Sequence, residues 1–348
     1  MKALFGWLKR LVLLLVVVIL GVLSPVAYVE LMCRPEGQAV AHDPLVGADW
    51  QRPEGRTLMT YPEWHIVHAY EDYAEVIRTG DPDDFGFLSS IGDFWSSTCA
   101  LSKASGPHGG FPWETKQMVY VIGVSFTAEL ALKAAYEETL GRIFAMVRGQ
   151  ARAPLDDLSA RQAADYAAFL QQVPWYKWDF RRDAEALDAA ASGSLRDRER
   201  RFALGLEYRA KAAYAGVIAA AVAATGEDQL RLRAVVSGVS SDVLAALPDV
   251  QVIETLTEGV VIEAPRYRAF TRLAEQIAAA GGEFVEIAGN DEILFTMISD
   301  DPMAEGAIHS FARQGNPGYR HLVLIPVAAL AEMIRSLPDG GLEHVHDY

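Results

Sequence analysis

Two histidines and an aspartate recur at helical spacing in the segment that begins near residue 60. His65, His68 and Asp72 are separated by three and then four residues, so on a helix they project from one face. Imidazole nitrogens and carboxylate oxygens bind divalent transition metals, which makes this face a candidate metal site. It lies opposite an apolar stripe, however, so we expect it to be the solvated side of an amphipathic helix. The stripe consists of Ile66, Tyr70, Tyr73 and Ile77.

Residues 343–347 contain a second histidine pair, flanked by acidic residues. On a β-strand, His344 and His346 project from one face, while Glu343 and Asp347 project from the other. The two imidazoles are therefore candidates for a second metal site. Because chain ends are usually peripheral, we expect an exposed strand with polar ends. The histidines elsewhere in the chain that would supply a third ligand are His309 and His321.

Glu129 interrupts an otherwise apolar run and is a candidate proton acceptor, since burial raises the pKa of a carboxylate. Lys133 follows it by four residues, and Arg142 follows Glu138 at the same spacing. Such pairs are ordinary features of helix surfaces. We therefore expect two helical ion pairs, with catalysis by Glu129, Glu138 or Arg142 as the alternative.

The chain has two cysteines, Cys33 and Cys99. In an oxidising compartment they would form a disulfide that closes a long loop. Two unrelated thiols are the alternative, and their spacing does not decide between the two.

Composition excludes some classes of partner. The chain is 51% hydrophobic, as in folded proteins, and has a net charge of −15. An acidic surface repels nucleic-acid phosphates and anionic lipid headgroups, so we predict no nucleic-acid partner. The glycine-rich phosphate loops, nucleophile elbow and paired-cysteine motifs of common enzymes are absent from the sequence. We therefore predict no cofactor other than a possible divalent transition metal.

The first half of the chain has mainly helical patterns. A capping box at Thr60 opens the histidine-bearing helix, which ends before residue 81. Residues 81–113 are predicted to be a loop region rich in aromatics. A second capping box, at Ser159, is predicted to open another helix. The other predicted helices cover residues 114–147 and 195–224.

Beyond residue 226 the hydrophobic period changes to two, which indicates strands. Glycine-containing turns predict two hairpins, one within residues 250–264 and one within residues 283–299. Single helices are expected between strands. The predicted class is α+β: a mainly helical half packed with an antiparallel or mixed sheet half, as a split βαβ-like sandwich. The remaining predicted elements are strands at 230–236, 320–327 and 342–348 and helices at 265–280 and 328–337.

A candidate membrane anchor precedes these elements. Residues 11–29 contain no charge and, as a helix, would extend about 28 Å, close to the thickness of the hydrocarbon core. Basic residues before this segment predict a cytoplasmic N-terminus. The remainder would be periplasmic in a bacterium with two membranes. The alternative is a signal peptide cleaved at residues 39–41, which lie unusually far from the apolar run.

The sequence therefore predicts four regions: an anchor at 1–33, a linker at 34–59, an aromatic-rich helical region at 60–225 and a sheet region at 226–348. Our first functional hypothesis is an inner-membrane protein whose periplasmic domain acts in binding or envelope assembly. Its partner would be another envelope protein or an apolar ligand. The alternative is a metal-assisted or acid–base enzyme that uses the histidine and carboxylate clusters.

Overall fold

The computed structural model describes residues 2–38, 42–53, 55–149, 151–225 and 230–348. Two predicted features lie outside these residues: the cleavage site at 39–41 and the start of the sheet region at 226–229. Of the predicted linker, the described residues contain one short 3₁₀ helix, Ala48–Trp50, and the start of the helix Arg56–Thr79.

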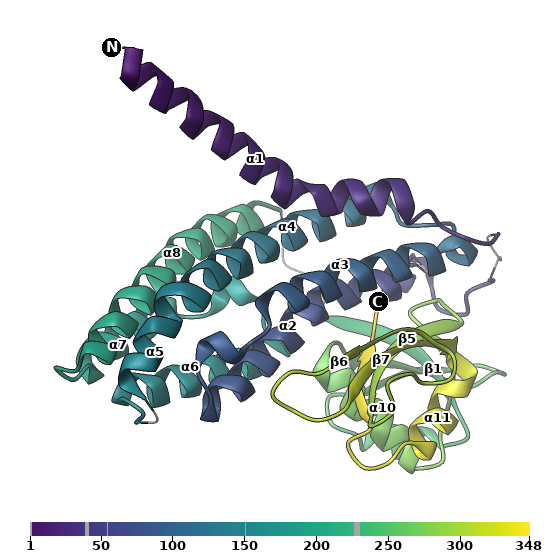
Figure 1. The fold of residues 1–348 in the computed structure, drawn as a ribbon. Coiled ribbons are helices and arrows are strands. Elements are labelled where there is room, and N and C mark those ends of the chain that lie inside the picture. Colours follow the sequence, from purple (N-terminus) through teal and green to yellow (C-terminus); the bar gives the residue numbers. More distant parts are fainter. Residues whose placement is uncertain (1, 39–41, 54, 150, 226–229) are drawn as a thin grey trace.

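The first helix, α1 (Lys2–Met32), projects from the rest of the molecule (Figure 1). Only its last turns pack against other elements, on α3 (Phe87–Ala104) and α4 (Trp113–Tyr136). A disulfide between Cys33 and Cys99 joins the end of α1 to α3. Among the described residues, two segments are long and apolar enough to cross a membrane by length and composition, Lys9–Met32 and Trp113–Arg148.

The helical half is arranged around α2 (Arg56–Thr79), which packs against α3, α4 and α6. A turn of π-helix, Glu137–Gly141, connects α4 to α5. Further helices complete the bundle: α5 (Arg142–Arg148), α6 (Pro154–Leu170), α7 (Phe180–Ala190) and α8 (Leu195–Thr225). Short 3₁₀ helices are Pro82–Asp84, Gly106–His108 and Trp175–Lys177.

Three predictions for the helical half are wrong. The histidine-bearing helix α2 begins at Arg56, so Thr60 is not its cap but lies within it, where its hydroxyl donates to the Thr57 carbonyl at 2.8 Å. The predicted aromatic loop contains α3, whose Phe94 and Trp95 are buried against α4. The next predicted helix begins at Pro154, five residues before Ser159. Proline is favoured in the first turn of a helix, and the Asp156 carboxylate accepts the N–H of Ala153 at 2.9 Å, so the helix is capped there.

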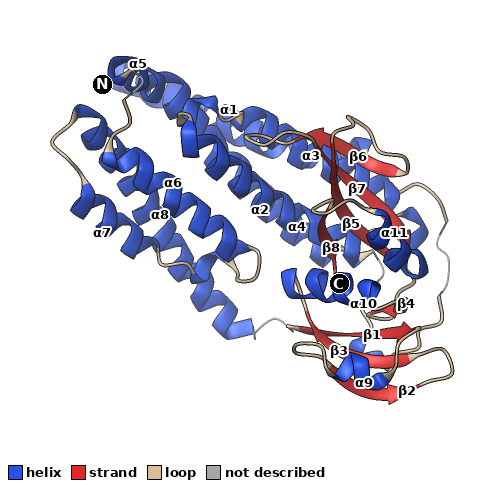
Figure 2. Cartoon of the chain, turned by 90° about the horizontal axis from the view of Figure 1, so that it is seen from below, coloured by secondary structure: helices blue, strands red, loops and turns tan. Residues whose placement is uncertain are grey.

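The second half forms two four-stranded sheets, which confirms the α+β class (Figure 2). The first sheet has the order β2-β3-β1-β4 and the second β6-β7-β5-β8, and all neighbours are antiparallel. The strands of the first sheet are β1 (Arg231–Ser237), β2 (Gln251–Thr255), β3 (Val260–Pro265) and β4 (Glu283–Ile287). Those of the second are β5 (Glu292–Ser299), β6 (Ala307–Ala312), β7 (Tyr319–Pro326) and β8 (Leu342–His346). The helices of this half are α9 (Ser241–Ala245), α10 (Arg268–Ala279), the 3₁₀ helix Val327–Ala329 and α11 (Leu330–Ser336).

The hairpin predicted at 250–264 is confirmed by the pairing of β2 with β3. The hairpin predicted at 283–299 is wrong, because β4 and β5 belong to different sheets. Ala288 and Gly289 between them both have positive φ and lead the chain from one sheet to the other. Strand β6 is an element that the hydrophobic pattern did not predict.

Helix α2 lies between the helical bundle and the second sheet. Its Leu58 and Tyr61 pack against Leu294 of β5 and Leu322 of β7 in one buried cluster. The same helix also contacts β8. Both sides of α2 are therefore covered by protein, which decides the environment of its histidines.

Candidate functional site

The histidine face of α2 is buried. The exposed fractions of His65, His68 and Asp72 are only 3%, 2% and 5%. The expectation of a solvated face is therefore wrong. The apolar stripe does pack on the bundle, but the opposite face of α2 is covered by the second sheet rather than by water.

Strand β8 is buried as well, between α2 and α10. His344 and His346 have no exposed surface, so the expectation of an exposed strand is wrong. Two threonine hydroxyls hold the strand from either side. Thr57 of α2 donates to the carbonyl of His346 at 2.6 Å, and Thr271 of α10 accepts the N–H of Val345 at 3.0 Å.

A β-bulge changes the direction in which Glu343 points. In the pairing with β5, Thr296 is opposite His344 and the next residue, Met297, is opposite Leu342, which leaves Glu343 as the extra residue. A bulge re-aims the side chain that it carries. Glu343 therefore contacts His68 of α2, and simple alternation along the strand was the wrong expectation.

His68 is the residue at which α2 and β8 meet. Its Nδ1 lies 2.8 Å from Oε2 of Glu71, and its Nε2 lies 3.5 Å from Oε2 of Glu343. A carboxylate oxygen can only accept, so Nδ1–H donates to Glu71. Each of the three side chains offers one ligand atom, and the three atoms lie within 4.8 Å of one another.

Arg320 of β7 fixes Glu343. It donates to both carboxylate oxygens, with Nε–Oε2 and Nη2–Oε1 distances of 2.6 and 2.7 Å, and its Nη1 lies 3.7 Å from Asp72. Burial by itself would raise the pKa of Glu343, but Arg320 outweighs burial and lowers that pKa to about 2. Burial raises the pKa of Asp72 despite the same arginine. Glu343 is therefore an anion at neutral pH.

His344 and His346 lie beside this group, around the ring of Trp64. The Trp64 ring stacks on His344 with a centroid distance of 3.4 Å, and the two imidazole centroids are 4.8 Å apart. Burial, and then the neighbouring histidines, lower both histidine pKa values well below the usual range. Among the described residues, Nε2 of His344 and both ring nitrogens of His346 have no hydrogen-bond partner.

His65 and the two predicted third ligands have other partners. His65 donates through Nε2 to the Ser90 carbonyl at 3.0 Å and accepts from Tyr61 at 3.3 Å, and burial lowers its pKa to about 3. His309 and His321 form hydrogen bonds with serine hydroxyls. The structure therefore brings together His68, His344 and His346, with Asp72 at the edge.

Glu129 is held in an ion pair, although not the expected one. Lys211 of α8 lies 2.7 Å from Glu129, and the Tyr70 hydroxyl donates to it at 2.5 Å. Lys133, the expected partner, instead lies 3.1 Å from Glu207 of α8. The expected i, i+4 pair is wrong because α8 supplies opposite charges across the helix–helix seam.

The second expected pair is wrong for a similar reason. Arg142 binds Asp83, with an Nε–Oδ2 distance of 3.0 Å, while Glu138 is exposed. Glu138 and Arg142 lie on the π turn and α5, far along the chain from the histidines.

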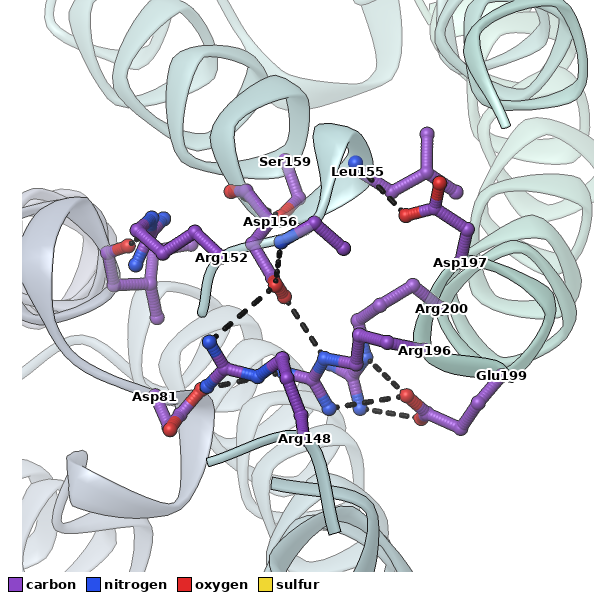
Figure 3. A network of polar contacts seen from close by, with 12 residues as sticks. Asp81, Arg148, Arg152, Leu155, Asp156, Ser159, Arg196, Asp197, Glu199 and Arg200 are labelled. Carbon is purple, nitrogen blue, oxygen red and sulfur yellow. Dashed lines mark hydrogen bonds and ion pairs between the residues drawn. The ribbon is translucent and has the colours of Figure 1, made fainter. Parts of the chain in front are cut away.

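A separate network of arginines and carboxylates lies at the far end of the helical bundle (Figure 3). Arg196 binds Asp156 and Glu199, at 2.9 and 3.1 Å, and Arg200 binds Glu137 at 2.8 Å. These are mutually paired charges, so we interpret the network as structural. It joins the first turn of α6 to α8 and the π turn.

Sequence reasoning missed three members of the histidine site: Trp64, Glu71 and Arg320. Glu71 follows His68 by three residues, and this spacing was a usable signal. Arg320 gave no local signal, because its partner Glu343 lies 23 residues further along the chain.

Comparison with known proteins gives no match. No family model, no curated protein and no solved structure is similar to this chain. The chemistry must therefore be argued from the geometry alone. The α2–β8 site combines imidazole nitrogens and carboxylates in a buried setting, which is a donor set suited to a cation.

Proposed function

We propose that this chain is a single-pass membrane protein whose folded part works as a binding module against the bilayer surface. The anchor is α1, with its N-terminus in the cytoplasm and the folded part in the periplasm. The observation that carries the proposal is a broad exposed apolar face on α4, α5 and α8, beside the attachment of α1. The proposed partner of that face is the lipid bilayer.

Helix α1 is attached firmly to the body. Beyond the disulfide of Cys33, the Glu30 carboxylate lies 2.6 Å from Lys116 and accepts the Tyr120 hydroxyl at 2.6 Å. Both partners belong to α4. The end of the proposed anchor therefore borders α4.

The exposed apolar face consists of side chains that are between 45% and 73% exposed. Monomeric soluble proteins rarely expose contiguous apolar surface of this kind, and such patches mark contact sites for proteins or membranes. On α4, the π turn and α5 the residues are Met118, Val121, Leu132, Leu140, Ile143, Met146 and Val147. On α8 they are Phe202, Leu206 and Val217.

These two rows lie on the same side of the helix pair. The pairing of Lys133 with Glu207, and of Glu129 with Lys211, shows that α4 and α8 run antiparallel. Lys133 and Glu207 lie at the interface between the two helices, and Leu132 and Leu206 each precede one of them by one position. Each leucine is therefore rotated about its helix axis by about 100° from the interface, in the same sense along the chain. In an antiparallel pair, residues rotated equally from the seam project from the same side. The rows therefore form one face.

The charges around this face also fit a membrane surface. The exposed charged residues of α8, within the described part of the chain, are the arginines 198, 201 and 209. Two of them, Arg201 and Arg209, share Asp188 of α7. Interfacial helices typically combine an apolar face with basic residues at its border. This local excess of arginine differs from the acidic average of the chain.

The sheet half fits a finer fold proposal. Counted within each sheet, both strand orders read 2-3-1-4 with antiparallel neighbours, which is the arrangement of a split βαβ unit. We propose that residues 230–348 contain two such units in tandem. In the second unit, a loop takes the place of the first helix.

The membrane contact is tested with spin labels on the full chain in liposomes. Leu132→Cys and Leu206→Cys carry the label on the apolar face, and Met303→Cys, 80% exposed in the sheet half, is the control. We expect the two face labels to be more accessible to oxygen than to a water-soluble nickel complex. Equal accessibility at the three sites would refute the lipid contact, and shielding from both reagents would indicate a protein partner instead.

The same control variant tests the topology. A membrane-impermeant maleimide should label Met303→Cys in intact spheroplasts. Labelling only after lysis would place the folded part in the cytoplasm and contradict the proposal.

A further inference from the structure

The contact between His68 and Glu343 is longer than an ordinary direct hydrogen bond. Nδ1 of His68 is bonded to Glu71, so Nε2 is the ring nitrogen that remains for a further partner. Nε2 has no hydrogen-bond partner among the described residues, and it faces Oε2 of Glu343. His68, Glu71 and Glu343 each place a ligand atom within 4.8 Å of the others, which is a grouping that can hold a metal ion.

The distance between these two atoms fits a shared metal ion. Ligand bonds to zinc are about 2.1 Å for nitrogen and oxygen, so two ligands at a tetrahedral angle are about 3.4 Å apart. The observed distance from Nε2 of His68 to Oε2 of Glu343 is 3.5 Å. Glu71 would act as the carboxylate that orients a metal-binding histidine through its other nitrogen.

Two carboxylates contact His68, those of Glu71 and Glu343. Arg320 pairs with Glu343 and Asp72, and Arg268 donates to the main-chain carbonyl of Glu343. The two carboxylates beside His68 supply oxygen ligands for a cation, and the guanidinium groups hold Glu343 in place.

Further nitrogen ligands are available nearby. His344 and His346 come from the same strand as Glu343, their rings are neutral, and their unpaired nitrogens are buried. Unpaired imidazole nitrogens in a protein interior are rare, because buried polar groups are nearly always bonded. They lie around the same Trp64 ring as His68, but the group of ligand atoms within 4.8 Å of one another consists of His68, Glu71 and Glu343.

A surface groove borders the site along α2. The groove has a volume of about 460 Å³ and lies between α2 and α6, and Glu71 lines it. Glu71 has 28% of its side chain exposed, whereas His68 has 2%. Glu71 is therefore the member of the group that borders solvent.

We propose that the α2–β8 junction binds one divalent transition metal ion, of the zinc class, through His68 and Glu343. Glu71 holds His68 in the binding tautomer, and a side-chain movement would bring the unpaired imidazole of His344 or His346 into the coordination. The ion bridges the helical half and the sheet half, because its ligands come from both. This site is independent of the proposed membrane contact, since it lies on other elements.

The test is metal analysis of the full chain, purified in detergent without chelators and then equilibrated with Zn²⁺ or Co²⁺. We expect one ion per chain, visible d–d absorption bands of low-symmetry Co²⁺, and a rise of Tm with Zn²⁺ that a chelator reverses. His68→Gln should abolish all three. His321→Gln is the matched histidine control and should retain them.

Because His68 is buried, His68→Gln could lose the metal simply by failing to fold. Glu71→Gln is a second variant that avoids this problem. It replaces a groove residue, and loss of such an orienting group should weaken metal affinity by about 10–100-fold while the apo-protein stays folded. Glu75→Gln, on the same helix and lining the same groove, is its control and should bind like the wild type. The proposal is overturned if the wild type binds no stoichiometric ion, or if Glu71→Gln and Glu75→Gln bind it equally.

Discussion

His65 shows how a residue can be chemically conspicuous and yet structural. Its two nitrogens are satisfied by Tyr61 and Ser90, and its ring is enclosed by Phe94 and Phe126. His68, three residues further on, is paired on one side only. The sequence predicted that both share a face, but the difference between them depends on the sheet that covers α2.

The burial of His65 predicts sensitivity to acid. Its pKa falls from 6.5 to about 3 on folding, so the unfolded chain binds the proton more readily. The stability contribution is complete above pH 6.5 and is lost as the pH falls towards 3, by about 1.4 kcal/mol per pH unit. Asp93, whose pKa burial raises to about 6, opposes part of this loss.

Chemical denaturation between pH 7.5 and 5 measures this effect. His65→Gln, which keeps a donor for the Ser90 carbonyl, should unfold with a weaker pH dependence than the wild type. His42→Gln, at a partly exposed position, is the control. An unchanged slope in His65→Gln would contradict the assignment.

Replacing Arg320 should be strongly destabilising. Arg320→Ala leaves Glu343 buried without its bidentate partner, and breaking a buried pair from one side costs about 3–5 kcal/mol. Arg78→Ala removes an arginine that is 64% exposed and pairs with Glu75, so it should change stability little. Urea unfolding compares the two, and similar losses would disprove the role of burial.

At the scale of elements, close packing of α3 on α4 depends on Gly123. A Cβ atom there would lie 2.4 Å from a ring carbon of Phe94. Gly123→Ala should therefore cost about 1–3 kcal/mol, by overpacking. Gly216→Ala on α8 meets nothing within 4 Å and should instead stabilise by about 0.5–1 kcal/mol, because alanine favours the helix. Thermal unfolding measures both effects: the Tm should fall for Gly123→Ala and rise for Gly216→Ala. A change of Tm in the same direction in both variants would contradict the packing argument.

Local signals predicted most strands and the long helices, because period and capping are properties of neighbouring residues. They did not predict α3, whose many aromatic residues resembled a loop, or the partners of β4 and β5. Strand partners depend on contacts far apart in sequence. The histidine site had the same limit: the residues of α2 and β8 could be named separately, but their meeting required the bulge at Glu343 and the position of Arg320.

At the scale of the whole molecule, α2 belongs to both halves. It packs on α6 in the bundle, and through Leu58 and Tyr61 it packs on the second sheet. We therefore expect the halves to unfold together. Hydrogen exchange followed by mass spectrometry should give peptides of α2 and β5 the same slowest opening free energy. A much faster exchange of the whole sheet half would show two independent units.

The covalent bond between Cys33 and Cys99 has a mechanical consequence. It removes the freedom to swivel at the point where α1 leaves the body, since Cys33 follows Met32 directly and Cys99 lies within α3. If α1 lies in lipid, its tilt in the bilayer sets the orientation of the folded body relative to the membrane surface. Bilayer thickness would then determine how deeply the helices beneath the anchor rest among the headgroups. Reduction of this crosslink would leave noncovalent contacts, such as those of Glu30 with Lys116 and Tyr120, to hold the orientation of α1.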